Sequence, residues 1–299
     1  MKKLKVIVSL ITQDNDYQRE QAAVAEDTAR RLGIDVQVMF ANSDAIEQTK
    51  QILATIRLTG DDRPDAIVCE PVGTGMPQVA KAAADGGIGW LVLNREADYL
   101  VPLRQSSTAP IGSFDCDNVE VGRIQGRQFA AMLPKGGKLL YIEGPSTDLT
   151  KQRRAGVAET LPSNIELKAV RGKWTEESGY QALFSRLPMQ TPEPPNIDLI
   201  GCQNDAMAMG ARRAIEGLPQ SKHRDAWLKI PLTGVDGVPT SGQAWVKERK
   251  LAATVITPAL TGFALDALVK ALGGGPKVPE RTLTKPVSFP QVSELKPIG

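Results

Sequence analysis

Short apolar runs alternate with segments of helical periodicity along almost the whole chain, and this alternation constrains the fold most. The first half predicts strands near 4–11, 34–40, 65–70, 89–94 and 110–115, with helices near 18–32, 44–58, 76–86 and 119–133. The second half predicts strands near 138–143, 165–170, 197–202, 230–235 and 251–257, with helices near 150–161, 175–187, 205–217, 239–249 and 259–272. Such β-α-β alternation indicates parallel sheets with helices on both faces.

Two sheets of similar size explain the pattern better than one. A single sheet of about ten strands would be unusually large, and 299 residues are enough for two ordinary domains. No Gly/Ser-rich spacer separates the halves, so residues 112–114 are expected to pass directly from one sheet to the next. The Pro-rich stretch 188–195 is predicted to be a surface loop, and the tail after residue 275 an extended segment packed on a domain.

Composition gives no support for a polyanionic partner or a metal site. The net charge is +2 and no block of Lys and Arg stands out, so no nucleic acid is expected as a partner. Cys69, Cys116 and Cys202 lie far apart in apolar runs and are predicted to be small buried residues. The single histidine, His223, lies in a polar, loop-like stretch and is expected to be solvated.

Motifs of catalysis and nucleotide binding are missing from the sequence. It contains no P-loop, and no Gly-x-Gly-x-x-Gly follows the first predicted strand. Gly73-Thr74-Gly75 could cradle an anion, but three residues make a weak match. One histidine gives little basis for a catalytic triad or a multi-histidine metal site. We therefore expect no catalytic residue, no metal and no cofactor, and hence a protein that is not an enzyme.

Residues 197–215 carry the most local information. A buried strand is predicted to end at Cys202, and a helix with an apolar face follows. Asp205 is expected to cap that helix. Asn204 then lies just past the carboxyl end of a strand, where open α/β sheets bind small ligands. The alternative is that these polar residues only form a turn and a cap.

Polar side chains recur at the ends of other predicted strands. They are Asn94 and Arg95 after the fourth strand, Asp236 after the 230–235 strand, and Asn15, Tyr17 and Gln18 in the loop after the first strand. Trp174 follows the 165–170 strand. Amides, carboxylates and a guanidinium can hydrogen-bond several hydroxyls, while aromatic rings cover the C–H faces. The pattern therefore favours a polyhydroxylated ligand.

The chain resembles periplasmic binding proteins of the ribose-binding type, whose fold also forms the effector-binding core of LacI-type repressors. The most specific segments are 117–122, 203–211, 234–239 and 250–255, with the sequences Asp-Asn-Val-Glu-Val-Gly, Gln-Asn-Asp-Ala-Met-Ala-Met-Gly-Ala, Gly-Val-Asp-Gly-Val-Pro and Lys-Leu-Ala-Ala-Thr-Val. The resemblance covers essentially the whole chain. It implies a type I fold, in which two Rossmann-like lobes, joined by three hinge crossovers, close on a ligand in an interlobe cleft.

Lobe boundaries and site residues follow from this resemblance. Lobe one is expected to comprise 1–112 with 258–282, and lobe two 113–257 with 283–299. The implied ligand-binding residues are Asn15, Tyr17, Gln18, Asn94, Arg95, Lys151, Trp174, Asn204, Asp236 and Thr257. Of these, only Lys151 and Thr257 come from the resemblance alone. Asp117 and Asn118 are expected to cap a helix.

Departures from the usual pattern leave the ligand open. Asn94 stands where an aspartate is usual, Lys151 where arginine is common, and Thr257 where a longer amide is common. An amide lacks the charge-assisted acceptors of a carboxylate, and a lysine lacks the bidentate fork of arginine. A monosaccharide is the expected ligand; a polyol, inositol, a furanosyl signal molecule or a nucleoside also fits.

The implied role is capture of this ligand for an ABC importer or a chemoreceptor. The first residues only superficially resemble a signal peptide, because their apolar stretch is short and breaks at residues 12–14. We expect a periplasmic protein whose signal has been removed, with no membrane insertion. The alternative is the cytoplasmic effector-binding core of a LacI-type regulator, which would need a helix-turn-helix ahead of the first strand.

Overall fold

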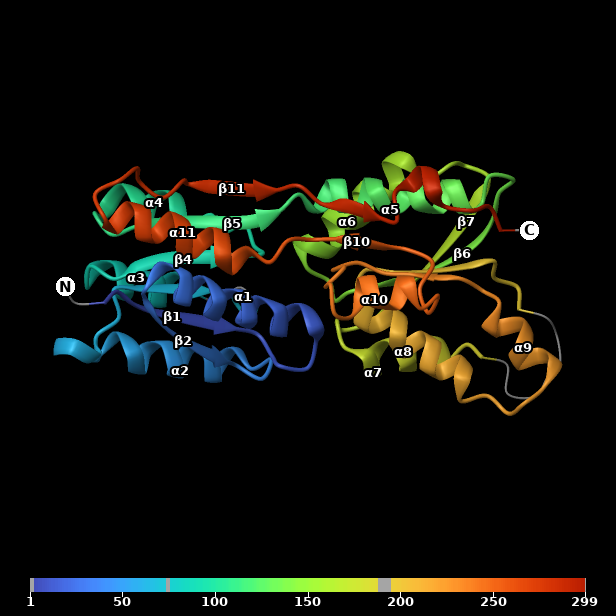
Figure 1. The fold of residues 1–299 in the computed structure, drawn as a ribbon, viewed down its shortest axis with the longest axis horizontal. Coiled ribbons are helices and arrows are strands. Elements are labelled where there is room, and N and C mark those ends of the chain that lie inside the picture. The colour runs from blue at the N-terminus through green and yellow to red at the C-terminus, as the bar shows by residue number, and fades with distance from the viewer. Residues whose placement is uncertain (1–2, 74–75, 188–194, 299) are drawn as a thin grey trace. The chain divides into compact units, whose positions relative to one another are not determined.

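The computed structural model describes residues 3–73, 76–187 and 195–298, and it has an α/β fold with parallel sheets (Figure 1). The chain divides into two compact units. Unit 1 is Met1–Cys116 with Ala259–Thr284, and unit 2 is Asp117–Pro258 with Lys285–Gly299. The chain therefore passes three times from one unit to the other.

Unit 1 is built on a six-stranded parallel sheet with the order β11-β5-β4-β3-β1-β2. Its elements are β1 (Lys5–Leu10), α1 (Asp16–Leu32), β2 (Asp35–Phe40), α2 (Ala45–Ile56), the 3₁₀ helix η1 (Gly60–Asp62), β3 (Ala66–Cys69), α3 (Pro77–Asp85), β4 (Gly89–Leu93), α4 (Leu100–Ser106), β5 (Ile111–Cys116), α11 (Leu260–Leu272) and β11 (Arg281–Thr284). Figure 1 shows β11, from the end of the chain, beside β5.

Both faces of this sheet are buried, as helices on two sides require. Along β1, Val6, Val8 and Leu10 pack in one core cluster with α1 and α11. Ile7 faces the other way, into a second cluster with Trp90 and the helices α2, α3 and α4. The alternation follows from the two-residue period of a strand, and burial on both faces explains the continuous apolar runs.

Unit 2 has a four-stranded parallel sheet, β7-β6-β8-β9, and an antiparallel pair, β10-β12. Its elements are α5 (Asn118–Met132), β6 (Gly137–Glu143), α6 (Asp148–Thr160), β7 (Ile165–Arg171), α7 (Glu176–Phe184), β8 (Leu199–Cys202), α8 (Asp205–Glu216), α9 (Lys222–Leu228), β9 (Leu232–Thr233), α10 (Gly242–Lys247), β10 (Thr254–Ile256), β12 (Val287–Phe289) and the 3₁₀ helix η2 (Val292–Glu294). Parallel bridges Thr233–Ala253 and Asp236–Ile256 continue the sheet from β9 toward β10.

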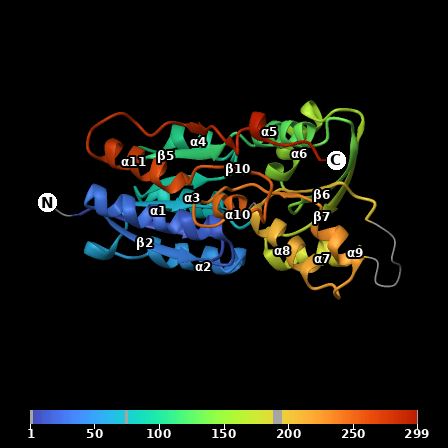
Figure 2. The ribbon, with the colours of Figure 1, turned by 45° about the vertical axis from the view of Figure 1, so that its right-hand side comes forward.

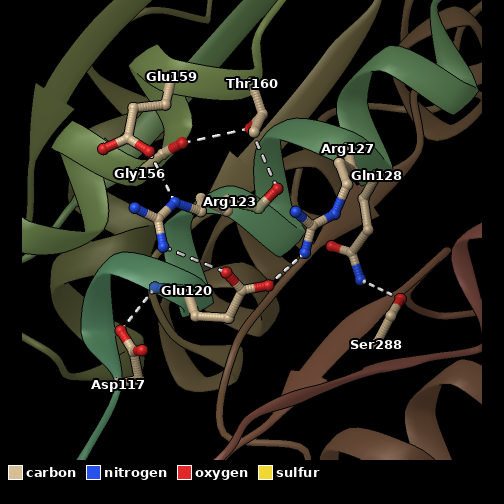
Figure 3. Close-up of polar contacts among 9 residues, drawn as sticks. All are labelled: Asp117, Glu120, Arg123, Arg127, Gln128, Gly156, Glu159, Thr160 and Ser288. Carbon is tan, nitrogen blue, oxygen red and sulfur yellow. Dashed lines mark hydrogen bonds and ion pairs between the residues drawn. The ribbon is translucent and has the colours of Figure 1, made fainter.

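Close helix pairs flank this sheet. Helices α7 and α8 lie side by side in both ribbon views (Figure 1 and Figure 2). They pack so closely that a Cβ atom at Gly210 of α8 would overlap the backbone carbonyl of Glu176 in α7. On the α5–α6 side, the Thr160 hydroxyl donates to the carbonyls of Arg123 (3.1 Å) and Gly156 (3.2 Å), as Figure 3 shows. The Gln128 amide donates to Ser288 Oγ of β12 (2.9 Å), which fixes the C-terminal strand on α5.

The observed unit boundaries differ from the predicted lobe boundaries by a few residues. The prediction ended the first segment of lobe one at 112, but β5 pairs with β4 and β11, and its pairing with β11 continues to Cys116. Residues 113–116 therefore belong to unit 1. Likewise, residues 283–284 belong to β11 of unit 1, and Pro258 to unit 2.

Most predicted elements are present, with a few corrections. The prediction of a loop around His223 is wrong, because Ser221 caps the short helix α9 there. Helix α4 is missing from the prediction, since Pro102 interrupts its apolar pattern. All three cysteines are buried and free, as expected. The predicted extended tail is confirmed by β11 and β12. Residues 188–194 of the predicted loop, and Thr74 and Gly75, lie outside the described residues.

Candidate functional site

The first group of predicted site residues lies at the start of α1 in unit 1. Asn15 caps the helix, because its Oδ1 accepts from the Gln18 backbone N–H (2.9 Å). The buried Gln18 side chain in turn accepts from the N–H of Ile11 (2.9 Å). The loop after β1 is therefore held against the first turn of α1, and Tyr17 is buried in that turn.

Asn94, directly after β4, joins this group. Its side-chain nitrogen is 3.3 Å from the Tyr17 hydroxyl, which also accepts from Gln21 Nε2 (2.9 Å). Because β1 and β4 flank β3 in a parallel sheet, their carboxyl ends meet at the same edge. The next residue, Arg95, donates to the Gly73 carbonyl. The structure thus brings Tyr17, Gln18 and Asn94 together, with Arg95 beside them.

A residue absent from the sequence prediction, Glu70, lies in the same place. It follows β3, the strand between β1 and β4, and only 7% of it is exposed. Burial raises the pKa of its carboxyl group to about 7, although Gln18, Asn94 and Arg95 each act to lower it. The sequence signal was a lone carboxylate between a buried strand and Pro71.

In unit 2, Asn204 caps helix α8, and the predicted capping role of Asp205 is wrong. Asn204 Oδ1 accepts from the Met207 N–H (2.9 Å), and its Nδ2 donates to the Trp174 carbonyl (2.9 Å). The Asp205 carboxylate is buried and accepts from the Gly237 N–H (2.8 Å) and the Thr254 hydroxyl (2.8 Å). Asn204 therefore both caps the helix and positions Trp174.

The ring of Trp174 lies close over the backbone of Gly144, where a Cβ atom would overlap it. The guanidinium of Arg153 lies 5.7 Å from the centre of this ring, at cation–π distance. Arg153 is 6% exposed and donates to Asn118 Oδ1 (3.0 Å). Sequence reasoning missed Arg153. It selected Lys151, whose side chain is 69% exposed and pairs with Asp148 (2.9 Å).

Asp236 and Thr257 are joined through their backbones. The Thr257 N–H donates to the Asp236 carbonyl (3.0 Å), and the Asp236 N–H donates to Val255 (2.9 Å). Thr257 is 5% exposed, and its Oγ1 has no hydrogen-bond partner in the described part of the chain. A buried hydroxyl without a partner is costly, and this one is able to hydrogen-bond a bound molecule.

Three of the predicted residues hold a left-handed backbone. The φ angles of Asn94, Trp174 and Asp236 are 54°, 67° and 110°, and none of the three is glycine. Such conformations cost free energy and cluster at ligand-binding sites. These three residues lie at or just beyond the ends of β4, β7 and β9, while Asn42, Ser43 and Arg249 hold a positive φ elsewhere in the described residues.

Within 3–73, 76–187 and 195–298, no group of three or more His, Cys, Asp or Glu side chains could hold a metal ion. Over the same residues, none of the helices has the length and apolar character needed to span a bilayer.

Comparisons with known proteins agree with this architecture. Residues 6–276 match the family described as periplasmic binding protein domain. The galactofuranose-binding protein YtfQ of Escherichia coli (strain K12) is 25% identical over 289 residues, which are 94% of this chain and 86% of that protein. A D-apiose import binding protein of Paraburkholderia graminis is 23% identical over 261 residues, covering 85% of this chain and 76% of that protein.

Solved structures show the same fold. An ABC transporter periplasmic solute binding protein from Actinobacillus succinogenes, with bound D-allose, superposes with a TM-score of 0.80 at 23% identity and covers 96% of this chain and 97% of its own. A galactofuranose binding protein gives a TM-score of 0.80 at 24% identity, with 95% and 94% covered. The fold is that of type I periplasmic binding proteins, and the family consists of binding proteins rather than enzymes. The chain belongs to the periplasmic binding protein family.

Proposed function

We propose that this protein captures a monosaccharide in the periplasm and delivers it to an ABC importer, without changing it chemically. The observation that carries the proposal is the left-handed backbone of Asn94, Trp174 and Asp236. All three residues lie at or near the ends of parallel strands, where this fold type binds ligands. The names of the relatives, which include galactofuranose, D-apiose and D-allose binders, support the sugar as ligand class.

The chemistry of these residues suits a ligand with several hydroxyl groups. Asn94 and Asp236 offer amide and carboxylate groups, and Thr257 offers a buried hydroxyl that has no partner among the described residues. The indole of Trp174 offers an apolar face for the C–H groups of a sugar ring.

Calorimetric titration with a sugar panel tests the proposal. The panel contains D-galactose, D-allose, D-apiose, L-arabinose, D-fucose and myo-inositol, each titrated separately. We expect at least one to bind, and the bound compound to be recovered unchanged by NMR. If none bound at about millimolar concentration, where the binding free energy is only about 4 kcal/mol, the sugar assignment would be wrong.

Asp236→Ala tests the site itself. Removing this carboxylate leaves ligand hydroxyls without an acceptor, so the affinity for the bound sugar should fall by about 1–3 kcal/mol. Asp225→Ala is the matched control, because Asp225 is an exposed aspartate on α9 of the same unit. Equal affinities of the two variants would contradict the role assigned to Asp236.

A further inference from the structure

The carboxyl group of Glu70 is buried without a full set of hydrogen bonds. Glu70 is 7% exposed, and its Oε2 has no hydrogen-bond partner among the residues that the structure describes. A buried carboxylate oxygen left unpaired carries a large desolvation cost. Such an oxygen is able to accept a hydrogen bond from a bound molecule.

The backbone of Glu70 is held by hydrogen bonds on both of its polar atoms. Its N–H donates to the carbonyl of Ser9 in β1 (2.8 Å), and its carbonyl accepts from Gln48 Nε2 of α2 (2.9 Å). Gln48 also accepts from the Val72 N–H (2.8 Å), which holds the chain on the other side of Glu70. The backbone position of Glu70 at the end of β3 is therefore built into the fold.

The neighbours of this carboxyl group are candidate ligand residues. The side chains of Gln18 and Asn94 and the charge of Arg95 all stabilise its ionised form. These groups come from α1 and from the loop after β4, which flank the end of β3. Glu70 thus adds a negatively charged hydrogen-bond acceptor to a cluster of two amides and a guanidinium.

We propose that Glu70 is a ligand-binding residue, whose Oε2 accepts a hydrogen bond from a hydroxyl group of the bound monosaccharide. This inference rests on the proposed function and adds a residue that determines which hydroxyl pattern is bound. The neutral amide of Asn94 provides only one oxygen, which lies 3.5 Å from the Tyr17 hydroxyl. The ionised Glu70 supplies the charge-assisted acceptor that this amide lacks.

Charged and titratable groups around Glu70 come from three sides. Arg95 after β4 lowers its pKa, Asp115 of β5 raises it, and Cys69 of β3 has a thiol pKa far above its usual range because of burial. Tyr17 on α1 contributes a hydroxyl near Asn94. Burial dominates, so the pKa of Glu70 is about 7. A donating hydroxyl favours the ionised carboxylate, so binding should release a proton near neutral pH.

Glu70→Gln tests the inference, with Glu26→Gln, an exposed glutamate of α1, as the matched control. Each protein is titrated at about pH 6 and about pH 8 with D-galactose, D-allose, D-apiose, L-arabinose, D-fucose and myo-inositol. For the sugar that binds, wild-type affinity should fall from about pH 8 to about pH 6, since protonation removes the acceptor. Glu70→Gln should bind at least about tenfold more weakly at about pH 8, without this pH dependence.

Chemical denaturation of Glu70→Gln checks that this variant is folded. The pKa of Glu70 lies above its usual value in the folded protein, so the folded chain holds this proton more tightly than the unfolded chain does. Without ligand, the wild type should therefore lose unfolding free energy relative to Glu70→Gln as the pH rises from about 5 to about 7.

The remaining outcomes separate the two proposals. If the wild type binds a sugar and Glu70→Gln binds it equally well, Glu70 makes no ligand contact. If wild-type affinity rises toward low pH, the carboxyl group donates a proton instead, and the acceptor role is wrong. If neither the wild type nor Glu26→Gln binds any of the sugars, the sugar-binding function fails, and the Glu70 contact with it.

Discussion

At the scale of single residues, Thr254 and Thr257 differ in the hydrogen bonding of their buried hydroxyl groups. Thr254 is fully buried, and its hydroxyl donates to both carboxylate oxygens of Asp205 (2.8 and 3.0 Å). Thr257 is also buried, but its hydroxyl has no partner in the described part of the chain. The first hydroxyl serves the fold, while the second is available to a ligand.

Replacement of each threonine by valine separates these duties. Thr254→Val removes the hydroxyl that donates to both oxygens of the buried Asp205 carboxylate and leaves the Gly237 N–H as a donor to Oδ2, so the unfolding free energy should fall by about 1–3 kcal/mol. Thr257→Val removes an unpaired hydroxyl, so stability should be unchanged or rise by about 1 kcal/mol, while sugar affinity should drop. Urea denaturation and calorimetry measure the two quantities. A Thr257→Val protein with full affinity would show that Thr257 is only structural.

At the scale of elements, close helix packing in unit 2 depends on glycines. A Cβ atom at Gly156 of α6 would overlap the Val119 carbonyl and come within 2.7 Å of the Arg123 nitrogen of α5. Both obstacles are backbone atoms, which cannot rotate away. Two contacts drawn in Figure 3 cross between the helices and depend on this short distance. They are the Arg123–Glu159 ion pair (2.6 Å) and the hydrogen bond from the Thr160 hydroxyl to the Arg123 carbonyl (3.1 Å).

Gly156→Ala should therefore push α6 away from α5 and lower the unfolding free energy by about 1–3 kcal/mol. Gly217→Ala at the end of α8 is the control, since a Cβ atom there has its nearest neighbour at 3.4 Å and φ is −74°. The control should change stability by less than about 0.5 kcal/mol. Chemical denaturation of both variants measures the difference, and equal losses would refute the packing argument.

The strands and the polar residues at their ends could be predicted from sequence, because burial on both faces leaves long apolar runs that stop at the sheet edge. The role of each polar residue could not be predicted in the same way. Asn204 and Asp205 are both good capping residues, and only the fold shows that Asp205 is turned toward Gly237 and Thr254. The burial of Arg153 could not be predicted either, because α6 is rich in polar residues and its sequence shows no clear inward face.

At the scale of the whole molecule, each unit is assembled from segments far apart in the chain. Unit 1 recruits β11 from Arg281–Thr284, and unit 2 recruits β12, which pairs with β10 and contacts α5 through Ser288. The stability of each unit therefore depends on a strand that comes from near the C-terminal end of the chain. The proposed ligand residues are likewise divided, with Asn94 in unit 1 and Asp236 in unit 2.

Hydrogen exchange with the bound sugar tests whether one ligand engages both units. A ligand that binds only the folded state stabilises what it contacts by mass action, so amides near its contacts should exchange more slowly. We expect slowing at residues 11–18 and 94–95 of unit 1 and at 204–207 and 255–258 of unit 2. Helix α9, which carries no proposed ligand residue, serves as the internal control. Slowing in one unit alone would mean that the other unit contributes no contact, and the residues assigned there would lose their role.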